Sequence, residues 1–513
     1  MTPGGSLEAL EPFRHVLGVR LGLRFEEDKS ELLARVLDER VEASGAGSPS
    51  TYLARLSGGG EDEVRALAER LTVGETYFFR NAHDMDAFTG AVLPARMEAR
   101  AAERRLRLLS AGCSSGEEPY TLAMLARGVP GLAGWDVRVQ GFDVNPAAVA
   151  RARAARYADW SLRQTSPALH ARFFRQDGRE FRVVDPVREL VTIEERNLAS
   201  EDPVFWEPGT FDVIFCRNVL MYLGPESVRR IVARFAGALA PGGFLFLGHA
   251  ETLRGVSTEF HLRQTHGTFY YQSRAPGEAA PAEAAAVSAV AAAPGAEPPP
   301  PAPGLGWMAA IEGASKRIAA LARGGAAEAP PAPGLRSPPA VGAPGLDGAF
   351  EAAQDLLARE RFVEALATLG PVPPERERDV DALLLRAVLL VSSGELRAAE
   401  AVCARVLQLD ELNAEAHYVH AICREHAADL AGAADHDRYA LYLDPTFAMP
   451  RLHLGLLAKR AGDLEQARRE LARALALFAA EDGSRILLLG GGFSRDALVD
   501  LCRAELSACG GRP

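Results

Sequence analysis

Long apolar runs and ordered cysteine patterns are both missing from this 513-residue chain. No uninterrupted apolar stretch reaches the length that a membrane-spanning helix needs, and the first residues lack the basic flank and apolar core of a signal peptide. The six cysteines show no CxxC or Cys/His spacing, a pattern that indicates a reducing compartment and no zinc site. We therefore expect a cytoplasmic protein that holds no metal and is not inserted in a membrane.

An excess of basic residues is missing as well. The formal net charge is −11, which argues against a general nucleic-acid-binding protein. A hydrophobic content of 48% and a charged content of 24% are those of a soluble globular protein. The length allows two or three domains.

The organising element of the sequence is a strand, a glycine-bearing turn and a helix in residues 106–125. Leu106, Leu108 and Leu109 read as a buried strand, and the turn Gly112-Cys-Ser-Ser-Gly116 follows. A second strand-like run, Val137–Phe142, is followed by Asp143, at a position where an acid accepts the hydroxyl groups of a nucleotide ribose in α/β proteins. The pattern predicts a nucleoside-binding crevice at the carboxyl ends of parallel strands.

The same turn disfavours a phosphate-bearing ligand. The Gly-x-Gly-x-x-Gly fingerprint of dinucleotide-binding folds is absent, and Glu117 and Glu118 open the helix where a pyrophosphate would dock. A ligand with a ribose, no phosphate and a positive charge suits the site better. S-adenosylmethionine fits that description.

Strands and helices alternate in the following residues. We expect a small inserted β lobe at about 158–189 with a turn at 176–178, a third core strand at 190–193, and later strands at 244–247 and 268–272. The clearest strand, Phe211–Asn218, is a near-continuous apolar run that ends in Arg217 and Asn218. Before the first strand, residues 7–80 read as helices. Thr76 and Arg80 are four positions apart, a spacing that would put both on one face of a helix.

The carboxyl-terminal part of the sequence repeats. Residues 275–347 are rich in Ala and Pro and read as a disordered linker. Ala365, Ala399, Ala433 and Ala467 then recur with a period of 34, which is typical of tetratricopeptide repeats. We expect repeats over 348–483 and a capping segment over 484–513, with Ser494 as a helix N-cap.

Residues 8–274 resemble the CheR chemotaxis receptor methyltransferases. The resemblance depends on six motifs that occur in order: Thr76-x-Phe-Phe-Arg80, Gly116-Glu-Glu-Pro-Tyr120, Phe142-Asp143, Asn197-Leu198, Phe215-Cys-Arg-Asn-Val219 and Gly248-His-Ala-Glu251. It implies an α/β Rossmann-like S-adenosylmethionine-dependent methyltransferase domain at 83–274, an N-terminal helical domain at 1–82 and a C-terminal all-α tetratricopeptide solenoid. The implied activity is transfer of a methyl group from S-adenosylmethionine to glutamate side chains of chemoreceptors, with the repeats binding a further protein.

The resemblance also implies site residues. The residues that it places around S-adenosylmethionine are Thr76, Arg80, Glu117, Asp143, Asn197, Leu198, Arg217 and Asn218. Asp143 would hold the ribose, Glu117 would complement the cationic methionyl end, and Asn197 and Leu198 would meet the adenine. Arg96 and Tyr222 are candidates for orienting the substrate carboxylate.

Two other functions remain open at this point. A methyltransferase acting on RNA or a small molecule would show the same turn and the same ribose acid, although the acidic net charge disfavours RNA. An inactive scaffold, in which only the repeats have a function, would conflict with the intact acidic and Arg-Asn motifs.

Overall fold

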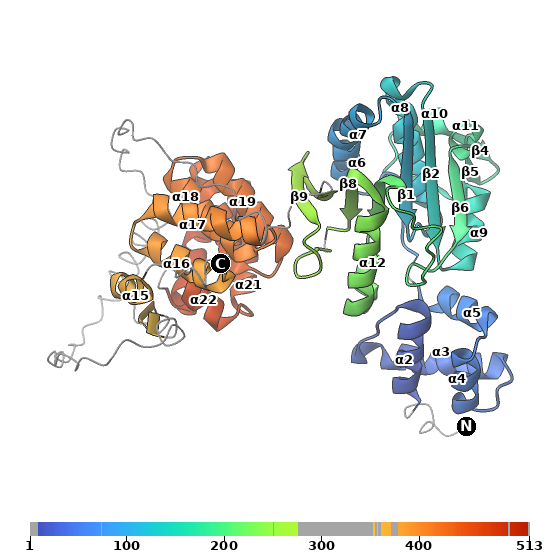
Figure 1. Cartoon of the computed structure of the whole chain (residues 1–513), viewed down its shortest axis with the longest axis horizontal. Coiled ribbons are helices and arrows are strands. Elements are labelled where there is room, and N and C mark those ends of the chain that lie inside the picture. Colours follow the sequence, from blue (N-terminus) through green and yellow to red (C-terminus); the bar gives the residue numbers. More distant parts are fainter. Residues whose placement is uncertain are drawn as a thin grey trace. The chain divides into compact units, whose positions relative to one another are not determined.

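The computed structural model describes residues 9–72, 74–249, 251–274, 352–353, 356–357, 361–370, 378–490 and 493–510 (Figure 1). The chain divides into two compact units, Met1–Glu278 and Ala279–Pro513. The predicted linker at 275–347 lies outside the described residues, so its boundaries stay predictions. Within the described residues, no helix is long and apolar enough to cross a membrane.

The first unit begins with a cluster of four helices. They are α2 (Leu10–Leu21), α3 (Ser30–Ala43), α4 (Pro49–Ser57) and α5 (Glu61–Leu71). The predicted apolar face of α3 is buried at Leu33, Val36, Leu37 and Val41, and it packs with apolar residues of the other three helices. These helices therefore have a core of their own, separate from that of the sheet.

A seven-stranded sheet follows, in the order β6-β2-β1-β7-β8-β10-β9. The strands are β1 (Arg105–Ala111), β2 (Asp136–Asp143), β6 (Val191–Glu195), β7 (Phe211–Cys216), β8 (Leu239–Leu247), β9 (Phe260–Thr265) and β10 (Thr268–Ser273). The first five strands of the order are parallel, and β10 and β9 continue the sheet antiparallel. The connections reverse direction between β1 and β7, which is where open α/β sheets bind ligands.

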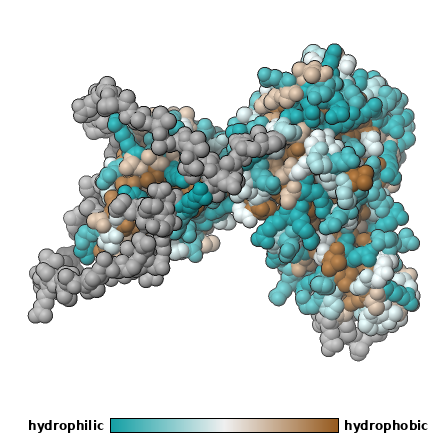
Figure 2. Space-filling model, in the orientation of Figure 1, coloured by the Kyte–Doolittle hydropathy of each residue, from teal (hydrophilic) through white to brown (hydrophobic). Residues whose placement is uncertain are grey.

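Helices accompany the sheet along its length. Their bounds are α6 (Ala82–Ala87), α7 (Leu93–Ala99), α8 (Glu117–Gly128), α9 (Pro146–Ala154), α10 (Pro167–Phe173), α11 (Asp185–Arg188) and α12 (Pro225–Ala238). All six residues of β7 are buried, as its continuous apolar run predicts. On the face shown in Figure 2, this unit is mostly hydrophilic with scattered apolar residues, as expected when the apolar strand residues lie inside.

The inserted lobe is a three-stranded sheet in the order β3-β5-β4. Its strands are β3 (Arg156–Tyr157), β4 (Phe174–Asp177) and β5 (Glu180–Val183). The predicted turn is present, with Gly178 at φ 67°. Two strand predictions were incomplete: β8 begins at Leu239 instead of Phe244, and β9 was missed.

The second unit is helical in its described residues. Its helices are α15 (Phe362–Leu369), α16 (Val380–Ser392), α17 (Leu396–Leu409), α18 (Ala414–His426), α19 (Leu430–Leu443), α20 (Ala448–Arg460), α21 (Leu464–Phe478), α22 (Gly483–Leu489) and α23 (Arg495–Ala508). The four alanines of the 34-residue period are completely buried, so they are contact positions between helices. Ser494 caps α23 as predicted, since its hydroxyl accepts the amide hydrogen of Ala497. The predicted fold class, α/β with a helical solenoid, is confirmed.

Candidate functional site

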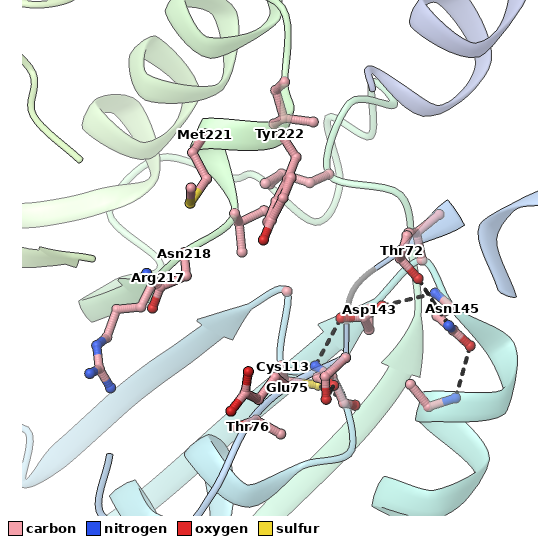
Figure 3. Close-up of a pocket in the computed structure, with 18 of the residues that line it drawn as sticks. Thr72, Glu75, Thr76, Cys113, Asp143, Asn145, Arg217, Asn218, Met221 and Tyr222 are labelled. Carbon is pink, nitrogen blue, oxygen red and sulfur yellow. Dashed lines mark hydrogen bonds between the residues drawn. The ribbon is translucent and has the colours of Figure 1, made fainter. Parts of the chain in front are cut away.

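A cavity of about 660 Å³ opens at the carboxyl ends of β1, β2 and β7. Its floor is formed by the turns that follow these strands, and its wall includes residues from α2, α5 and the segment between α2 and α3. That segment is fixed over the site because Leu23 forms a β-bridge with Leu223 and the Arg24 amide donates to the Tyr222 carbonyl at 2.8 Å. Figure 3 shows the residues that point into the cavity from opposite sides.

Asp143, at the end of β2, is held by backbone amides. Its Oδ2 accepts the N–H of Ser114 at 2.8 Å, and its Oδ1 accepts the N–H of Asn145 at 2.9 Å (Figure 3). Burial raises the pKa of Asp143, and the bonds from these amides oppose that rise. Because each carboxylate oxygen can accept more than one hydrogen bond, Asp143 is positioned to accept the two hydroxyl groups of a ribose.

Asn145 connects this acid to the N-terminal helices. Its side-chain Oδ1 caps α9 by accepting the Ala148 amide at 3.0 Å, and its Nδ2 donates to the Thr72 hydroxyl at 2.9 Å. Both residues line the cavity. Neither residue was predicted from the sequence, although Asn145-Pro146 carries a recognisable helix-start signal.

The turn between β1 and α8 depends on glycine. Gly112 has φ 77°, and a Cβ there would lie 2.5 Å from a methyl group of Val219 in the turn after β7. Only glycine combines this backbone conformation with such a close approach. The two turns that form the floor of the cavity therefore come together because position 112 has no side chain.

A buried charge cluster lies at one end of the cavity. The Arg217 guanidinium pairs with Asp84 at 3.0 Å and with Glu118 at 3.3 Å, and it donates to the Arg80 carbonyl at 2.9 Å. The three side chains are exposed by only 5%, 3% and 14%. Burial raises the pKa of both acids, and the Arg217 charge opposes that rise. With both carboxylates ionised, the three side chains sum to a charge of −1, which favours a positively charged ligand.

Glu117 lies apart from the other predicted cofactor-binding residues. It does not line the cavity: its carboxylate turns away and accepts the hydroxyl hydrogens of Ser115 and Ser161 at 2.8 and 3.0 Å. Its neighbour Glu118 lines the cavity instead and pairs with Arg217. Successive residues of a helix point about 100° apart, so only one of the two acids can face the ligand.

The segment before α6 was also predicted incorrectly in its conformation. Residues 74–77 form no helix, so Thr76 and Arg80 do not share a helical face. Both nevertheless line the cavity, and the Arg80 guanidinium donates to the Glu75 carbonyl at 2.9 Å.

The turn after β7 is held from within by Glu251. Its carboxylate accepts the backbone N–H groups of Asn218, Val219, Met221 and Gly248, at 2.7 to 3.2 Å. Asn218 itself has φ 58°, a left-handed conformation that such bonds stabilise. The acid of the Gly248–Glu251 motif thus shapes the cavity floor without lining the cavity.

The opposite side of the cavity contains Asn197, Leu198 and Tyr222. The Asn197 amide donates to the Arg20 carbonyl at 2.7 Å and accepts the Ala199 N–H at 2.8 Å. Tyr222 is 39% exposed and reaches into the cavity from the segment after β7 (Figure 3). Seven of the eight predicted cofactor-binding residues, all except Glu117, are thereby brought together.

Arg96, the other predicted substrate-orienting residue, does not line this cavity. Its guanidinium is buried and pairs with Asp212 at 2.7 Å and with the Pro241 carbonyl at 2.9 Å. Asp212 stands near the amino end of β7, at the edge of the sheet opposite the cavity. Arg96 therefore joins α7 to the sheet.

The polar and charged side chains at the cavity fit S-adenosylmethionine. Asp143 offers acceptors to a ribose, and the cluster of Asp84, Glu118 and Arg217 is negative where a sulfonium or ammonium group would lie. The amino end of α8, which would attract a phosphate, instead presents a carboxylate, so a phosphate-free ligand is favoured.

Comparison with known proteins agrees with this geometry. Residues 74–269 match the family model "CheR methyltransferase, SAM binding domain". The chain is 32% identical over 265 residues to a probable chemotaxis protein methyltransferase of Rhizobium etli, an alignment covering 50% of this chain and 98% of that protein. It is 30% identical over 478 residues to a probable biofilm formation methyltransferase, WspC, of Pseudomonas putida, covering 90% of this chain and 97% of that protein.

A further match concerns a solved structure. PcrH from Pseudomonas aeruginosa is 20% identical, with a TM-score of 0.23, covering 26% of this chain and 92% of that chain.

Proposed function

Because the chain belongs to the CheR family of S-adenosylmethionine-dependent chemotaxis methyltransferases, we propose that it forms methyl esters on glutamate side chains of chemoreceptors. The observation that supports this most strongly is the cavity, which combines a ribose acceptor, a negative charge cluster and an open mouth. The Rhizobium relative, named a chemotaxis protein methyltransferase, matches over nearly its whole length.

The chemistry asks little of the protein beyond alignment. S-adenosylmethionine, when bound, supplies a methyl group activated by the neighbouring sulfonium charge. A glutamate side chain is ionised at pH 7 and is already a nucleophile, so the protein needs no general base. The residues of the cavity have to orient the two reactants and exclude water.

We assign the cofactor-holding roles as follows. Asp143 accepts the ribose hydroxyls, the backbone of Asn197 and Leu198 meets the adenine edge, and the acidic cluster around Arg217 complements the methionyl end. Tyr222, half-exposed at the mouth, contacts the incoming carboxylate. Thr76, Arg80 and Asn218 complete the wall between these groups.

Methylation with labelled cofactor tests the proposal. Purified protein, tritiated S-adenosylmethionine and receptor-containing membranes should give labelled receptor, and mild alkali should release the label as methanol. Mapping of the modified peptide should find glutamate. Label that resists alkali, or label found in RNA, would instead favour the other methyltransferase classes.

Binding of the product separates an enzyme from an inactive scaffold. Isothermal titration with S-adenosylhomocysteine should show one site per chain. A chain that binds neither this compound nor S-adenosylmethionine would be a scaffold.

The match to the Pseudomonas putida protein extends over most of this chain, and it favours a second process, beside motility, that receptor methylation would control. That relative is named for biofilm formation and covers both units of this chain, so we propose biofilm formation beside motility as the process that receptor methylation controls. Deletion of the gene should then change surface attachment at least as strongly as swimming. We place the reaction in the cytoplasm, where the signalling domains of chemoreceptors lie.

A further inference from the structure

One helix of the second unit, α22, stands outside the regular order of the repeats. Within the repeats, the second helix of each pair packs on the first helix of the next: α17 on α18, and α19 on α20. The helix that packs on α21 in the same way is α23. Helix α22, which lies between α21 and α23 in the sequence, instead contacts α16 in the earliest of these repeats (Figure 1).

Arg485 fixes the amino end of α22 among acidic residues of three elements. Its guanidinium lies 3.1 Å from Glu415 of α18, 2.9 Å from Asp444 after α19, and 3.3 Å from Glu481. It also lies over the ring of Phe447, 4.9 Å from the centroid, at the start of α20. A planar cation held by three carboxylates and an aromatic face is in a specific arginine site.

The apolar side of α22 completes the contact. Leu488 packs against the cluster that contains Leu385 and Leu389 of α16, while Ile486 and Leu489 are 5% and 4% exposed. The carboxylate of Glu481 accepts the amide hydrogen of Ala448, the first residue of α20. Helix α22 and Glu481 just before it thus contact α16, α18 and the beginning of α20, which are the first helices of three successive pairs. Stacked helix pairs form extended surfaces that bind peptides.

Helix α22 has features of a segment that can detach from the repeats. Its seven residues are fewer than an isolated helix needs for stability in water. Gly483 begins it, and Gly490, Gly491 and Gly492 follow it in the sequence. Helix α23 has its own anchors, since Leu498, Leu501 and Cys502 are buried and Glu505 pairs with Lys459. Release of α22 would therefore leave the flanking helices in place.

We propose that α22 occupies the partner-binding site of the repeats as an internal competitor. The partner we infer is a short helical segment of another protein that carries an arginine followed by aliphatic residues, in the pattern of Arg485, Ile486 and Leu488. The partner's arginine enters the site formed by Glu415, Asp444 and Phe447, and α22 is displaced. This inference concerns the second unit alone and does not depend on methyl transfer.

A labelled peptide with the sequence of residues 481–490 and a neutral soluble tail tests the proposal on the full-length chain. The unchanged chain should bind it weakly, because a tethered competitor acts at an effective concentration in the millimolar range. The double variant Arg485→Ser, Leu488→Ser should bind it about tenfold or more tightly. Adding Glu415→Lys to that variant should abolish the binding, whereas Arg503→Ala, a change in an exposed ion pair of α23, should have no effect.

Two further measurements keep the outcome interpretable. An unchanged helical circular dichroism signal and an unchanged thermal unfolding transition of the repeats show that the variants are folded. If the double variant does not fold, hydrogen exchange on the unchanged chain replaces it: excess peptide should increase exchange in residues 483–489. The proposal is overturned if the peptide binds no variant, if Glu415→Lys does not reduce its binding, or if the opened chain only pairs with a second copy.

Discussion

At the scale of single residues, Asp143 carries the most specific prediction. Asp143→Asn removes the charge that would accept the ribose hydroxyls. Hydrogen bonds to charged groups contribute about 1.5–3 kcal/mol, so we expect the affinity for S-adenosylhomocysteine to fall by about tenfold to a hundredfold. Isothermal titration measures it. Asp86→Asn, on the exposed side of α6, is the matched control, and equal affinities for both variants would contradict the assigned role.

Arg217 carries a prediction about stability. Arg217→Met leaves the carboxylates of Asp84 and Glu118 buried without their shared cation. Removal of one partner from a buried ion pair costs about 3–5 kcal/mol, and urea unfolding of the first unit should show a loss of this size. Adding Asp84→Asn should recover part of it. No loss in the single variant would mean that the two acids take up protons at little cost.

Some residue assignments could be made from the sequence and others could not. Asp143 and Asn218 follow predicted strands directly, so strand position alone brought them to the site. The choice between Glu117 and Glu118 required the rotational phase of α8, which no sequence pattern supplies. Arg96 was placed near the substrate by charge alone, and its partner Asp212 is distant in sequence.

At the scale of elements, the strands of the sheet were predictable where both faces are buried. The apolar run of β7 could only be interpreted as a buried strand. Strand β9 mixes polar and apolar residues, and it was missed. Its turn, His266-Gly267 at φ 52° and 75°, is the kind of two-residue connection that joins hairpin strands. Glycine at the second position was the signal that could have found it.

Helix α20 carries a prediction about pH. His453 is completely buried between Asp437 at 2.8 Å and Glu425 at 3.3 Å. Although burial opposes the charge, these two carboxylates raise the pKa of His453 to about 9. Because this pKa lies above the unfolded value of about 6.5, the stabilisation is complete below pH 6.5 and is lost as the pH rises through 9.

Thermal unfolding of the repeats at several pH values tests this prediction. The transition should shift to lower temperature between pH 7 and pH 10. In His453→Gln the same shift should be reduced, because the variant has no imidazolium to lose. A wild-type transition that does not move over this range would show that the histidine is neutral in the fold.

At the scale of the whole molecule, we expect the two units to have separable tasks. The Rhizobium relative matches over 265 residues, 98% of its own length, and the matched family model covers residues 74–269, which lie in the first unit. We therefore expect residues 1–278 to bind S-adenosylhomocysteine with an affinity within about twofold of that of the full chain, because every residue that lines the cavity belongs to this compact unit. Titration of both proteins decides this. A tenfold weaker fragment would show that the repeats support the cofactor site.

The general architecture was visible in the sequence because it is periodic. Alternating strands and helices predicted the sheet, and the 34-residue period predicted the helix pairs. Helix α22 has no counterpart in that period, so its return to α16 could not be foreseen. Contacts between residues about a hundred positions apart leave no trace in a repeat pattern.

The position of Glu251 in the sequence determines when the cofactor pocket can form during synthesis of the chain. It holds the turn of Asn218 from 33 positions further along the chain, and this turn forms part of the cavity floor. A nascent polypeptide therefore cannot close its cofactor pocket until the ribosome has released the segment beyond β8. Synthesis of this protein must be well past the parallel strands before a small molecule can help it fold.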